Sequence, residues 1–412
     1  MTEPLSWRWR FSVGFAVLLV ALTIAACTSD GPNSTSDGPN SASDGVTGTT
    51  PTEPAHDDIA VGPPLVARLG DQTTVFDTTD RAFQASLRNM SIADANRFGA
   101  SDDVFEKAFG PDEGLDLSLT ANGCTSCHIN NGRRDPTGGV NFQAVEFEGV
   151  ALQYPAAIFG PTTADVRVAP AVIGMGLLEA IPAADIEALA DPDDADGDGI
   201  SGRVHYVVDP ATGETVVGRF GWQASQATVL SQSSTAFETD LGILTPLLSG
   251  ADAEISEETA ELAAFYSEGL AVPARRNADD PANINGAAVF ETIGCSSCHT
   301  PSFTTGDAEL HALSGQEIWP YTDMLLHDMG PDMAGAVTFG GAAATEFRTA
   351  PLWGIGLHET VNGSTTFLHD GRARTLEEAI VWHGGEGAAS RNAYLDLDAD
   401  QKRQLLTFLE NL

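Results

Sequence analysis

The chain has 412 residues, with 20 Lys+Arg against 58 Asp+Glu, which gives a formal net charge of −38. That charge argues against nucleic acid as a partner, because a phosphate backbone is bound through Lys and Arg. A hydrophobic fraction of 42% with 19% charged residues is typical of a globular protein, and the length allows two or three domains. The five cysteines, few and odd in number, do not indicate a disulfide framework.

The first 26 residues have the features of an export signal. Arg8 and Arg10 precede an apolar run that is shorter than the roughly 20 residues that a membrane span needs. The run ends in Ile-Ala-Ala-Cys at residues 24–27, which resembles a bacterial lipobox, whose cysteine is acylated after cleavage. We therefore predict a lipoprotein signal peptide over residues 1–26, with an ordinary signal or an uncleaved anchor as the alternatives.

Lipidation of Cys27 would attach the chain to a membrane. The next residue is Thr28 rather than Asp, which favours the outer membrane in a host with two membranes. Residues 27–64 are predicted to form a disordered tether, because Ser-Asp-Gly-Pro-Asn begins at Ser29 and again at Ser36, and such residues cannot bury enough apolar area to fold. The expected location is the cell envelope, facing the periplasm or the cell surface.

Two C-x-x-C-H motifs use the four cysteines that follow Cys27. Two thiols about one helical turn apart add to the vinyl groups of a haem, and the adjacent imidazole becomes an axial ligand of its iron. A zinc site built from the two C-x-x-C pairs is the competing interpretation, but it leaves the histidine after each pair unexplained. The predicted residues for two covalently bound c-type haems are Cys124, Cys127 and His128, and Cys295, Cys298 and His299.

After each motif, the two halves of the chain share a further pattern. Residues 167–179 and 348–359 both read R-x-A-P…G-x-G-L-x-E, with a gap of one residue, which indicates an internal duplication. Apolar periodicity predicts an amphipathic helix over residues 400–412 that packs across the helix before the second motif. We expect a mainly α fold of two cytochrome c-like haem domains, over residues 65–255 and 256–412. We find no counterpart of the segment 367–383 in the N-terminal half.

That C-terminal segment contains H-D-G-R and then L-E-E-A. It resembles the C-terminal domain of bacterial dihaem cytochrome c peroxidases and of the dihaem enzyme that matures methylamine dehydrogenase. More widely, the chain from about residue 110 onwards is similar to the di-haem oxidoreductase family, also called thiol oxidoreductase-like. Besides the two C-x-x-C-H motifs, the resemblance rests on residues 176–182, 194–203, 326–330 and 382–386. The thiol label gains no support, because no cysteine remains for thiol chemistry.

The resemblance implies a ligand for the second haem. In the peroxidases, a Met 14 residues after the histidine of H-D-G is the sixth ligand of the C-terminal haem. Counting from His369, that position is His383. The resemblance therefore implies that His299 and His383 both bind the iron of the second haem. The alternative is a structural role for His383, in which case His327 or His358 stays open as the sixth ligand. His369 is expected to hold its loop through the adjacent Asp370.

The first haem has His128 on one side, and an open opposite side is expected. An open iron can take peroxide, whose cleavage needs an acid/base that carries a proton between the two oxygens. By resemblance to the peroxidases, Glu179 is the candidate catalytic residue. The alternatives are that Glu179 caps a turn or forms an ion pair. Met175 could instead be a sixth ligand, which would make this haem an electron carrier.

An acidic loop resembles the first half of an EF-hand calcium loop. It reads D-x-D-x-D-G from residue 194, but position twelve is His205 and not the bidentate Glu. A β-hairpin is predicted after it, over residues 204–208 and 215–220. The alternative is a solvated acidic turn. The predicted Ca²⁺ ligands are the side chains of Asp194, Asp196 and Asp198 and the backbone carbonyl of Ile200.

These patterns favour an exported dihaem oxidoreductase of peroxidase type. Peroxide or another small oxidant is expected to be reduced at the N-terminal haem, while the C-terminal haem relays electrons from an external donor such as a small cytochrome. The alternative is an electron-transfer dihaem cytochrome without its own substrate. The sixth position of the first haem discriminates between the two. The candidates for an aromatic residue between the haems are Trp222, Trp319, Trp353 and Trp382.

Overall fold

The computed structural model describes residues 67–119, 121–133, 142–147, 150–155, 167–335, 337–363 and 366–412. All of them belong to one compact unit, Ala60–Leu412. Within these ranges, no helix is both long and apolar enough to cross a membrane. The predicted signal peptide, the lipidation site Cys27 and the tether lie outside the described residues.

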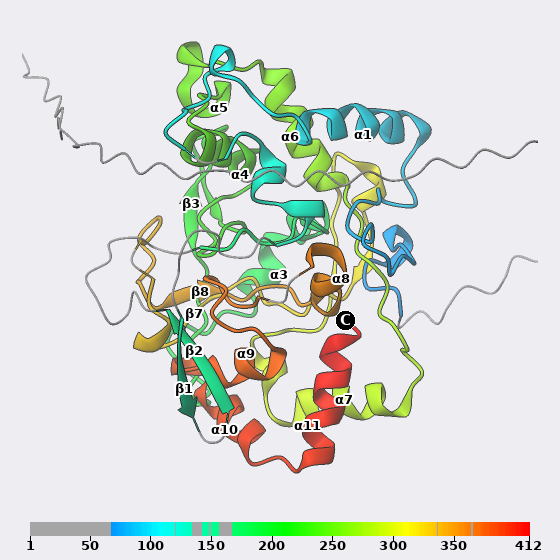
Figure 1. Cartoon of the computed structure of the whole chain (residues 1–412), viewed down its shortest axis with the longest axis vertical. Coiled ribbons are helices and arrows are strands. Elements are labelled where there is room, and N and C mark those ends of the chain that lie inside the picture. Colours follow the sequence, from blue (N-terminus) through cyan, green and yellow to red (C-terminus); the bar gives the residue numbers. More distant parts are fainter. Residues whose placement is uncertain are drawn as a thin grey trace, which may run out of the picture. The chain divides into compact units, whose positions relative to one another are not determined.

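The N-terminal half is built around two helices, α1 and α6, that pack side by side (Figure 1). Each begins after a serine, Ser91 or Ser256, whose hydroxyl accepts a hydrogen bond from the first turn. Phe98 and Phe105 of α1 lie on Tyr266 of α6, with ring centroids 4.9 and 4.7 Å apart. The helices of this half are α1 (Ile92–Phe105), α2 (Met175–Glu179), α3 (Ala183–Glu187), α4 (Val229–Ala236), α5 (Pro246–Ser249) and α6 (Glu257–Gly269).

The C-terminal half repeats this arrangement with α7 and α11. Gly286 lets the two helices cross closely, because a Cβ there would clash with the backbone oxygen of Gln404. Phe290 of α7 and Phe408 of α11 have ring centroids 5.4 Å apart. The helices of this half are α7 (Pro281–Thr292), α8 (His358–Asn362), α9 (Leu376–Trp382), α10 (Ala388–Leu395) and α11 (Ala399–Glu410).

The two G-x-G motifs show how the halves correspond. Gly174 and Gly354 both have left-handed backbones, with φ of 68° and 72°, which a residue with a Cβ adopts rarely. The backbone N–H of Gly174 donates to Leu270 after α6, and that of Gly354 donates to Leu412 after α11, each at 3.1 Å. Helix α6, at the beginning of the predicted domain 256–412, packs on α1, α4 and α2 of the N-terminal half.

The C-terminal segment also has a counterpart, which corrects the expectation from the sequence. Phe220 pairs with Gln226 in an isolated antiparallel bridge, as Phe367 pairs with Ala373. Two residues later, the hydroxyls of Thr228 and Thr375 cap α4 and α9 in the same way. The sequence comparison missed this correspondence because Trp222 and Gln223 occupy the places of His369 and Asp370.

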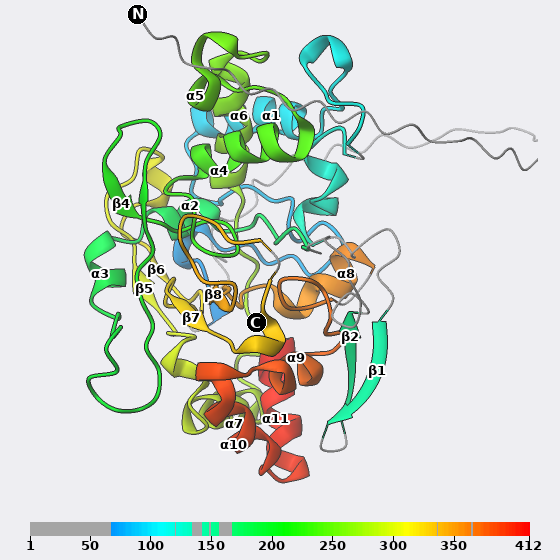
Figure 2. The same cartoon turned by 90° about the vertical axis from the view of Figure 1, so that its left-hand side faces the viewer.

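Short strands form two-stranded antiparallel pairs. The pair β1–β2 lies beside α9 (Figure 2), and the sequence analysis had not predicted it. The pair β3–β4 occupies the position of the expected hairpin. The pairs are β1 (Phe142–Phe147) with β2 (Val150–Pro155), β3 (Tyr206–Val208) with β4 (Thr215–Val217), β5 (Phe303–Thr304) with β6 (Glu317–Ile318), and β7 (Leu326–Asp328) with β8 (Glu346–Arg348).

One apolar core runs through both halves, so the two domains are not packed independently. Trp353, just before Gly354, packs on Gly174 of the other half. In the reciprocal contact, Ile173, just before Gly174, packs on Gly354. The duplicated motifs therefore face each other at the junction of the halves, and this positions the two C-x-x-C-H motifs relative to each other.

Candidate haem centres

The first attachment motif lies on a short 3₁₀ turn, Cys124–Ser126, followed by His128. The ring Nδ1 of His128 is 2.9 Å from the carbonyl oxygen of Pro170. Because Nδ1 donates to that oxygen, Nε2 keeps its lone pair. Burial lowers the pKa of His128 to about 4, and the hydrogen bond to Pro170 opposes that shift only in part. A neutral imidazole with Nε2 available is the form that binds a haem iron.

The second motif has the same geometry. It lies on the turn Cys295–Ser297, and Nδ1 of His299 is 2.8 Å from the carbonyl oxygen of Tyr321. Burial again lowers the histidine pKa to about 4. The aromatic neighbour is also shared, because Phe290 lies 6.3 Å from the ring of His299, as Phe105 lies 6.3 Å from the ring of His128.

The cysteines of both motifs fit covalent haem attachment. They are thiols and partly buried. Burial raises the pKa of Cys124 and of Cys295 to about 12, so both stay protonated. The thiol, and not a disulfide, is the form that adds to a vinyl group. The donor set at each motif therefore matches a c-type haem.

A third histidine lies close to the second motif. His383 follows the last residue of α9, and its Nδ1 is 2.7 Å from the carbonyl oxygen of Ala379. Its Nε2 is therefore also available, and burial lowers the pKa of this imidazole too. His383 is near enough to His299 to act on the pKa of that residue. The second motif thus has two neutral imidazoles that could bind one iron.

The corresponding position in the first half carries no ligand. His383 is eight residues after the cap Thr375, and Ala236 is eight residues after the equivalent cap Thr228. The backbone differs as well, because α4 continues from Ala236 into a π-helical turn, whereas α9 ends before His383. The methyl group of Ala236 cannot coordinate iron, so the two halves differ where the second half has a potential sixth ligand.

Glu179 is engaged at the beginning of α4. Its Oε2 accepts a hydrogen bond of 3.0 Å from the backbone N–H of Val229. Burial raises the pKa of Glu179, and this N–H and the nearby Arg219 oppose the shift. The structural role considered for Glu179, a cap, is therefore present. Met175 begins α2 and is partly buried against the apolar core.

The other histidines have different surroundings. His358 is buried between Phe83 and Phe367, and burial lowers its pKa to about 3. The ring of His369 stacks on Phe347, with centroids 4.1 Å apart.

The loop around His369 is held in another way than expected. Asp370 is bound chiefly by Arg372, whose Nε lies 2.8 Å from its Oδ2. The Nε2 of His369 is 3.9 Å from the same carboxylate oxygen. The carboxylate of Asp370 therefore binds Arg372 in preference to His369, because a guanidinium is always charged and matches a carboxylate in shape.

Comparison with known proteins decides the family. The sequence profile described as "di-haem oxidoreductase, putative peroxidase" matches residues 160–252 and 248–412, more than half of the chain. The chain belongs to the di-haem oxidoreductase family. Two successive matches agree with the duplication seen in the fold, and membership implies two haem cofactors. Among curated proteins, no match was found.

Several solved structures are similar to this di-haem oxidoreductase. Hydrazine synthase of Kuenenia stuttgartiensis is 17% identical, with 91% of this chain and 100% of that chain covered and a TM-score of 0.38. A MauG-like protein associated with microbial copper homeostasis is 18% identical, with 80% and 91% covered and a TM-score of 0.41. A variant of the diheme peroxidase BthA from Burkholderia thailandensis is 16% identical, with 84% and 92% covered and a TM-score of 0.40.

The acidic loop of the di-haem oxidoreductase brings its predicted ligands together. Carboxylate oxygens of Asp194, Asp196 and Asp198 lie within 4.8 Å of one another. The backbone N–H of Gly199 donates to Oδ1 of Asp194 and so closes the turn. His205 does not contribute to the loop, because both its ring nitrogens face backbone carbonyls elsewhere. Three convergent carboxylates are a ligand type suited to Ca²⁺.

The four tryptophans considered as candidates for a residue between the haems lie in different surroundings. Trp353 is buried at the junction of the halves, against Gly174. Trp222 is partly buried and donates from Nε1 to the carbonyl of Val168, whereas Trp382 lies under the guanidinium of Arg372. Trp319 is partly buried against the core.

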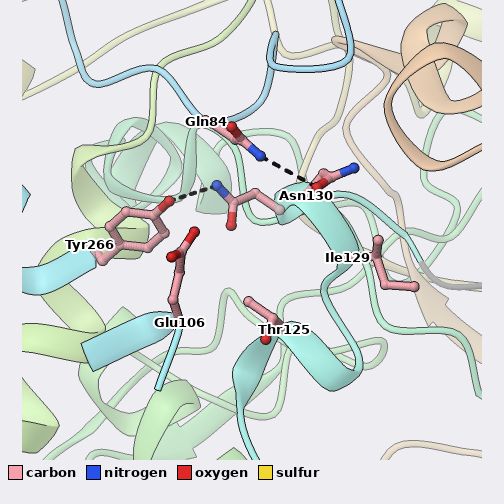
Figure 3. A pocket seen from close by; sticks show the side chains of 7 residues that line it. Gln84, Glu106, Thr125, Ile129, Asn130 and Tyr266 are labelled. Atoms are coloured by element: carbon pink, nitrogen blue, oxygen red, sulfur yellow. Dashed lines mark hydrogen bonds between the residues drawn. The ribbon is translucent and has the colours of Figure 1, made fainter. Parts of the chain in front are cut away.

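A polar hollow of about 140 Å³ lies beside the first attachment loop (Figure 3). The side chains of Glu106 and Tyr266 point toward it, and the Tyr266 hydroxyl accepts a hydrogen bond of 2.8 Å from Asn131. The hollow shows that the outer side of this loop is accessible to solvent. Its lining residues are Gln84, Glu106, Thr125, Ile129, Asn130, Asn131 and Tyr266.

Sequence reasoning missed one cluster of charged residues beside the second motif. His327 had been considered only as an iron ligand, yet its ring nitrogens face Asp323 and Glu386. A D-x-x-x-H spacing from residue 323 was the available signal. Glu386 comes from a distant part of the chain, so no local pattern could have linked it to the other two.

Proposed function

We propose that this protein is an exported dihaem c-type cytochrome oxidoreductase that reduces peroxide or another small oxidant at its N-terminal haem, while its C-terminal haem relays electrons. The observation that carries the proposal is the pair of equivalent positions Ala236 and His383. A ligand at one and a methyl group at the other favour one open haem and one closed haem. An iron with a free coordination position can bind substrate, whereas an iron with both positions occupied is suited to electron transfer.

At the first site, Cys124 and Cys127 would form the thioether bonds and His128 would bind the iron. A haem held there supplies an iron with one open position, at which an oxidant can bind. The hydrogen bond from His128 Nδ1 to the carbonyl oxygen of Pro170 fixes the orientation of the ring and raises its basicity, as acceptors behind metal-binding histidines do. At the second site, Cys295 and Cys298 would form the bonds.

His299 and His383 would both bind the iron of the second haem. Both imidazoles are neutral and both have Nδ1 engaged by a backbone carbonyl, so each offers only Nε2. A haem with both axial positions occupied cannot take substrate, and it changes its ligands little when it gains or loses an electron. These properties suit a relay that receives electrons from an external donor, such as a small cytochrome or another redox protein.

Glu179 is proposed as the acid/base of the first site. Reduction of peroxide to water consumes two electrons and two protons, and a carboxyl group must bring a proton to the departing oxygen. Burial raises the pKa of Glu179, which favours the protonated form that such a donor needs. The contact with Val229 would then hold one carboxylate oxygen while the other exchanges the proton.

Trp353 is proposed as the residue through which electrons pass between the halves. It is buried and packs on Gly174, four residues after the Pro170 that holds His128. An indole at this junction is a polarisable group that shortens the path through backbone and aliphatic side chains. The lipid anchor at Cys27 would keep the protein in the cell envelope, near an external donor.

A Ca²⁺ ion is proposed in the loop of Asp194, Asp196 and Asp198, with the Ile200 carbonyl as a further ligand. The support is the convergence of the three carboxylates. The ion would hold the loop ahead of β3 and β4. Binding of Tb³⁺ in place of Ca²⁺, followed by its luminescence, tests the site, and D196N should abolish the signal.

An electron-transfer cytochrome without its own substrate is the second candidate. The contact between Glu179 and Val229 favours it, because this carboxylate already has a structural partner. In that case Met175 or another residue would close the first haem, and peroxide would find no open iron.

Electron paramagnetic resonance of the purified ferric protein separates the two functions. Spectra are recorded before and after one-electron reduction and again after addition of peroxide. The proposal expects a high-spin signal that disappears with peroxide. Two low-spin signals that peroxide leaves unchanged in both redox states would refute the enzyme and support the electron carrier.

A further inference from the structure

A buried histidine lies between two carboxylates beside the second attachment motif. Nε2 of His327 is 2.8 Å from Oδ2 of Asp323, and its Nδ1 is 2.7 Å from Oε2 of Glu386. The side chains are 3%, 2% and 10% exposed, in that order. An ionised carboxylate only accepts hydrogen bonds, so both ring nitrogens must carry a hydrogen. His327 is therefore an imidazolium, in agreement with its pKa, which the two carboxylates raise to about 12 against the effect of burial.

This charge lies next to the proposed haem attachment. Nδ1 of His327 is also 3.7 Å from Sγ of Cys298, and His327 is among the groups that act on the pKa of His299. The site is buried, and charges interact more strongly away from water. The surrounding charges are Asp323 and Glu386, and the partly buried Arg348 also acts on Asp323.

Glu386 connects three segments of the chain. Its carboxylate accepts hydrogen bonds from the backbone N–H and the hydroxyl of Ser201, at 3.0 and 2.9 Å, and from the backbone N–H of Asp328, at 3.1 Å. It belongs to the turn Gly385–Gly387, which begins two residues after His383. One side chain thus joins the end of the acidic loop and β7 to the turn that follows the proposed sixth ligand.

The end of the acidic loop also packs directly on the imidazolium ring. A Cβ at Gly202 would lie 2.5 Å from Cε1 of His327, so only glycine allows this approach. Arg203 and Leu326 then exchange backbone hydrogen bonds of 3.0 and 2.9 Å. Asp323, Glu386 and Gly202 together hold the ring, and its charge has a fixed position relative to Cys298.

We propose that His327, Asp323 and Glu386 form a charged network that sets the reduction potential of the second haem, with Glu386 also positioning the turn that follows His383. The inference rests on the proposed attachment of that haem at Cys295, Cys298 and His299. A ferric haem carries one more positive charge than a ferrous haem. The imidazolium therefore favours reduction, and each carboxylate opposes it.

Opposite signs distinguish this role from simple support of the fold. H327Q removes the positive charge and keeps a hydrogen-bonding side chain, so the potential of the second haem should fall. E386Q removes a negative charge and keeps the shape, so the potential should rise. A change that only loosened the pocket would act in the same direction in both variants.

The experiment is a spectroelectrochemical titration of the intact dihaem protein, in the wild type, H327Q, E386Q and S201A. We expect each charge change to alter the ratio of oxidised to reduced second haem by about tenfold at a fixed potential, which is about 59 mV for one electron. S201A removes one hydrogen bond from Glu386 without a change of charge and should leave the potential unchanged. H327K should recover part of the potential that H327Q loses.

Shifts of the same sign in H327Q and E386Q, or no shift in either, would overturn the inference. Haem content is measured first, by mass and by the pyridine haemochrome. If the wild type lacks a haem at the second motif, the proposed attachment fails and this inference fails with it. If H327Q does not fold, the reduction potentials of E386Q and D323N test the inference instead. Both should then raise the potential while the low-spin resonance of the second haem stays unchanged, and a changed resonance would show loosening instead.

Discussion

The two halves of the molecule share one scaffold and differ at one helix end. In both, a pair of crossing helices holds an aromatic residue 6.3 Å from the histidine of a C-x-x-C-H motif. In both, a backbone carbonyl binds Nδ1 of that histidine. The halves diverge eight residues after an equivalent threonine cap, at Ala236 and His383. Duplication therefore kept the surroundings of the histidine in each C-x-x-C-H motif, and the halves differ at a position with an imidazole in one and a methyl group in the other.

The loops before these helix ends differ in chemistry but not in shape. The amide of Gln223 donates to the carbonyls of Ala343 and Glu346, each at 2.9 Å, where the equivalent Asp370 pairs with Arg372. An amide and an ion pair thus support the same turn. Equal backbone geometry with different side chains shows that the duplicated fold constrains hydrogen bonding more strongly than residue identity.

Removal of His383 should have the largest effect, because it would erase the main difference between the halves. H383A is expected to replace the low-spin resonance of the second haem by a high-spin one, which paramagnetic resonance detects. H311A changes an exposed histidine of the same half and should leave both resonances as in the wild type. A second haem that remains low-spin in H383A would show that another residue, such as His358, is its ligand.

Loss of the carboxyl group of Glu179 should have the second largest effect, because this residue is proposed to act only in the first half. E179Q keeps an oxygen that can accept from Val229 but cannot carry the proton, so peroxide turnover should fall about 10²–10⁴-fold with the melting temperature unchanged. E179A removes the cap too and should also lower stability, by about 1 kcal/mol. Full turnover in E179Q would leave Glu179 with the capping role alone.

The equivalent glycines Gly176 and Gly356 test whether the chain packs equally tightly on the last turns of α6 and α11. A Cβ at Gly176 would lie 2.5 Å from the backbone oxygen of Glu268, and one at Gly356 would clash with that of Glu410. G176A and G356A should each cost about 1–3 kcal/mol of unfolding free energy, measured by denaturant titration. G99A in α1, with no atom within 4 Å of its Cβ, should instead stabilise the protein. Unchanged stability in either variant would show a looser crossing in that half.

The smallest expected effect concerns pH and the last turn of α6. Burial and the neighbouring Glu179 raise the pKa of Glu268 from 4.5 to about 7, against the effect of Arg97. The folded state holds this proton more tightly than the unfolded state, so the contribution to stability is present below pH 4.5 and is lost as the pH rises through about 7.

Substitution by the neutral glutamine should remove this dependence. E268Q should melt like the wild type at about pH 5, and about 2–4 °C higher at about pH 8. The equivalent residue Glu410 is exposed, so E410Q serves as the control and should show no such difference. Equal melting curves of E268Q and the wild type at both pH values would contradict the assignment.

Much of the site followed from local patterns. The spacing of Cys, Cys and His needs only five consecutive residues, and the resemblance to the dihaem peroxidases, at a fixed distance from His369, implied His383 as a ligand. The acidic loop was also recognisable, because its three carboxylates are two residues apart. What failed was an inference that depended on packing, namely that the segment 367–383 has no counterpart in the N-terminal half.

The sequence by itself determined the two attachment motifs, the duplication and the family, because these depend on residue identities at short spacings. Only the tertiary structure showed that α6 packs on helices of the N-terminal half and that Ala236 corresponds to His383. Only it showed that Glu386 reaches His327 across 59 positions of the chain. The physical reason is that hydrogen bonds and burial bring together groups that are distant in sequence, and their energies depend on three-dimensional distance alone.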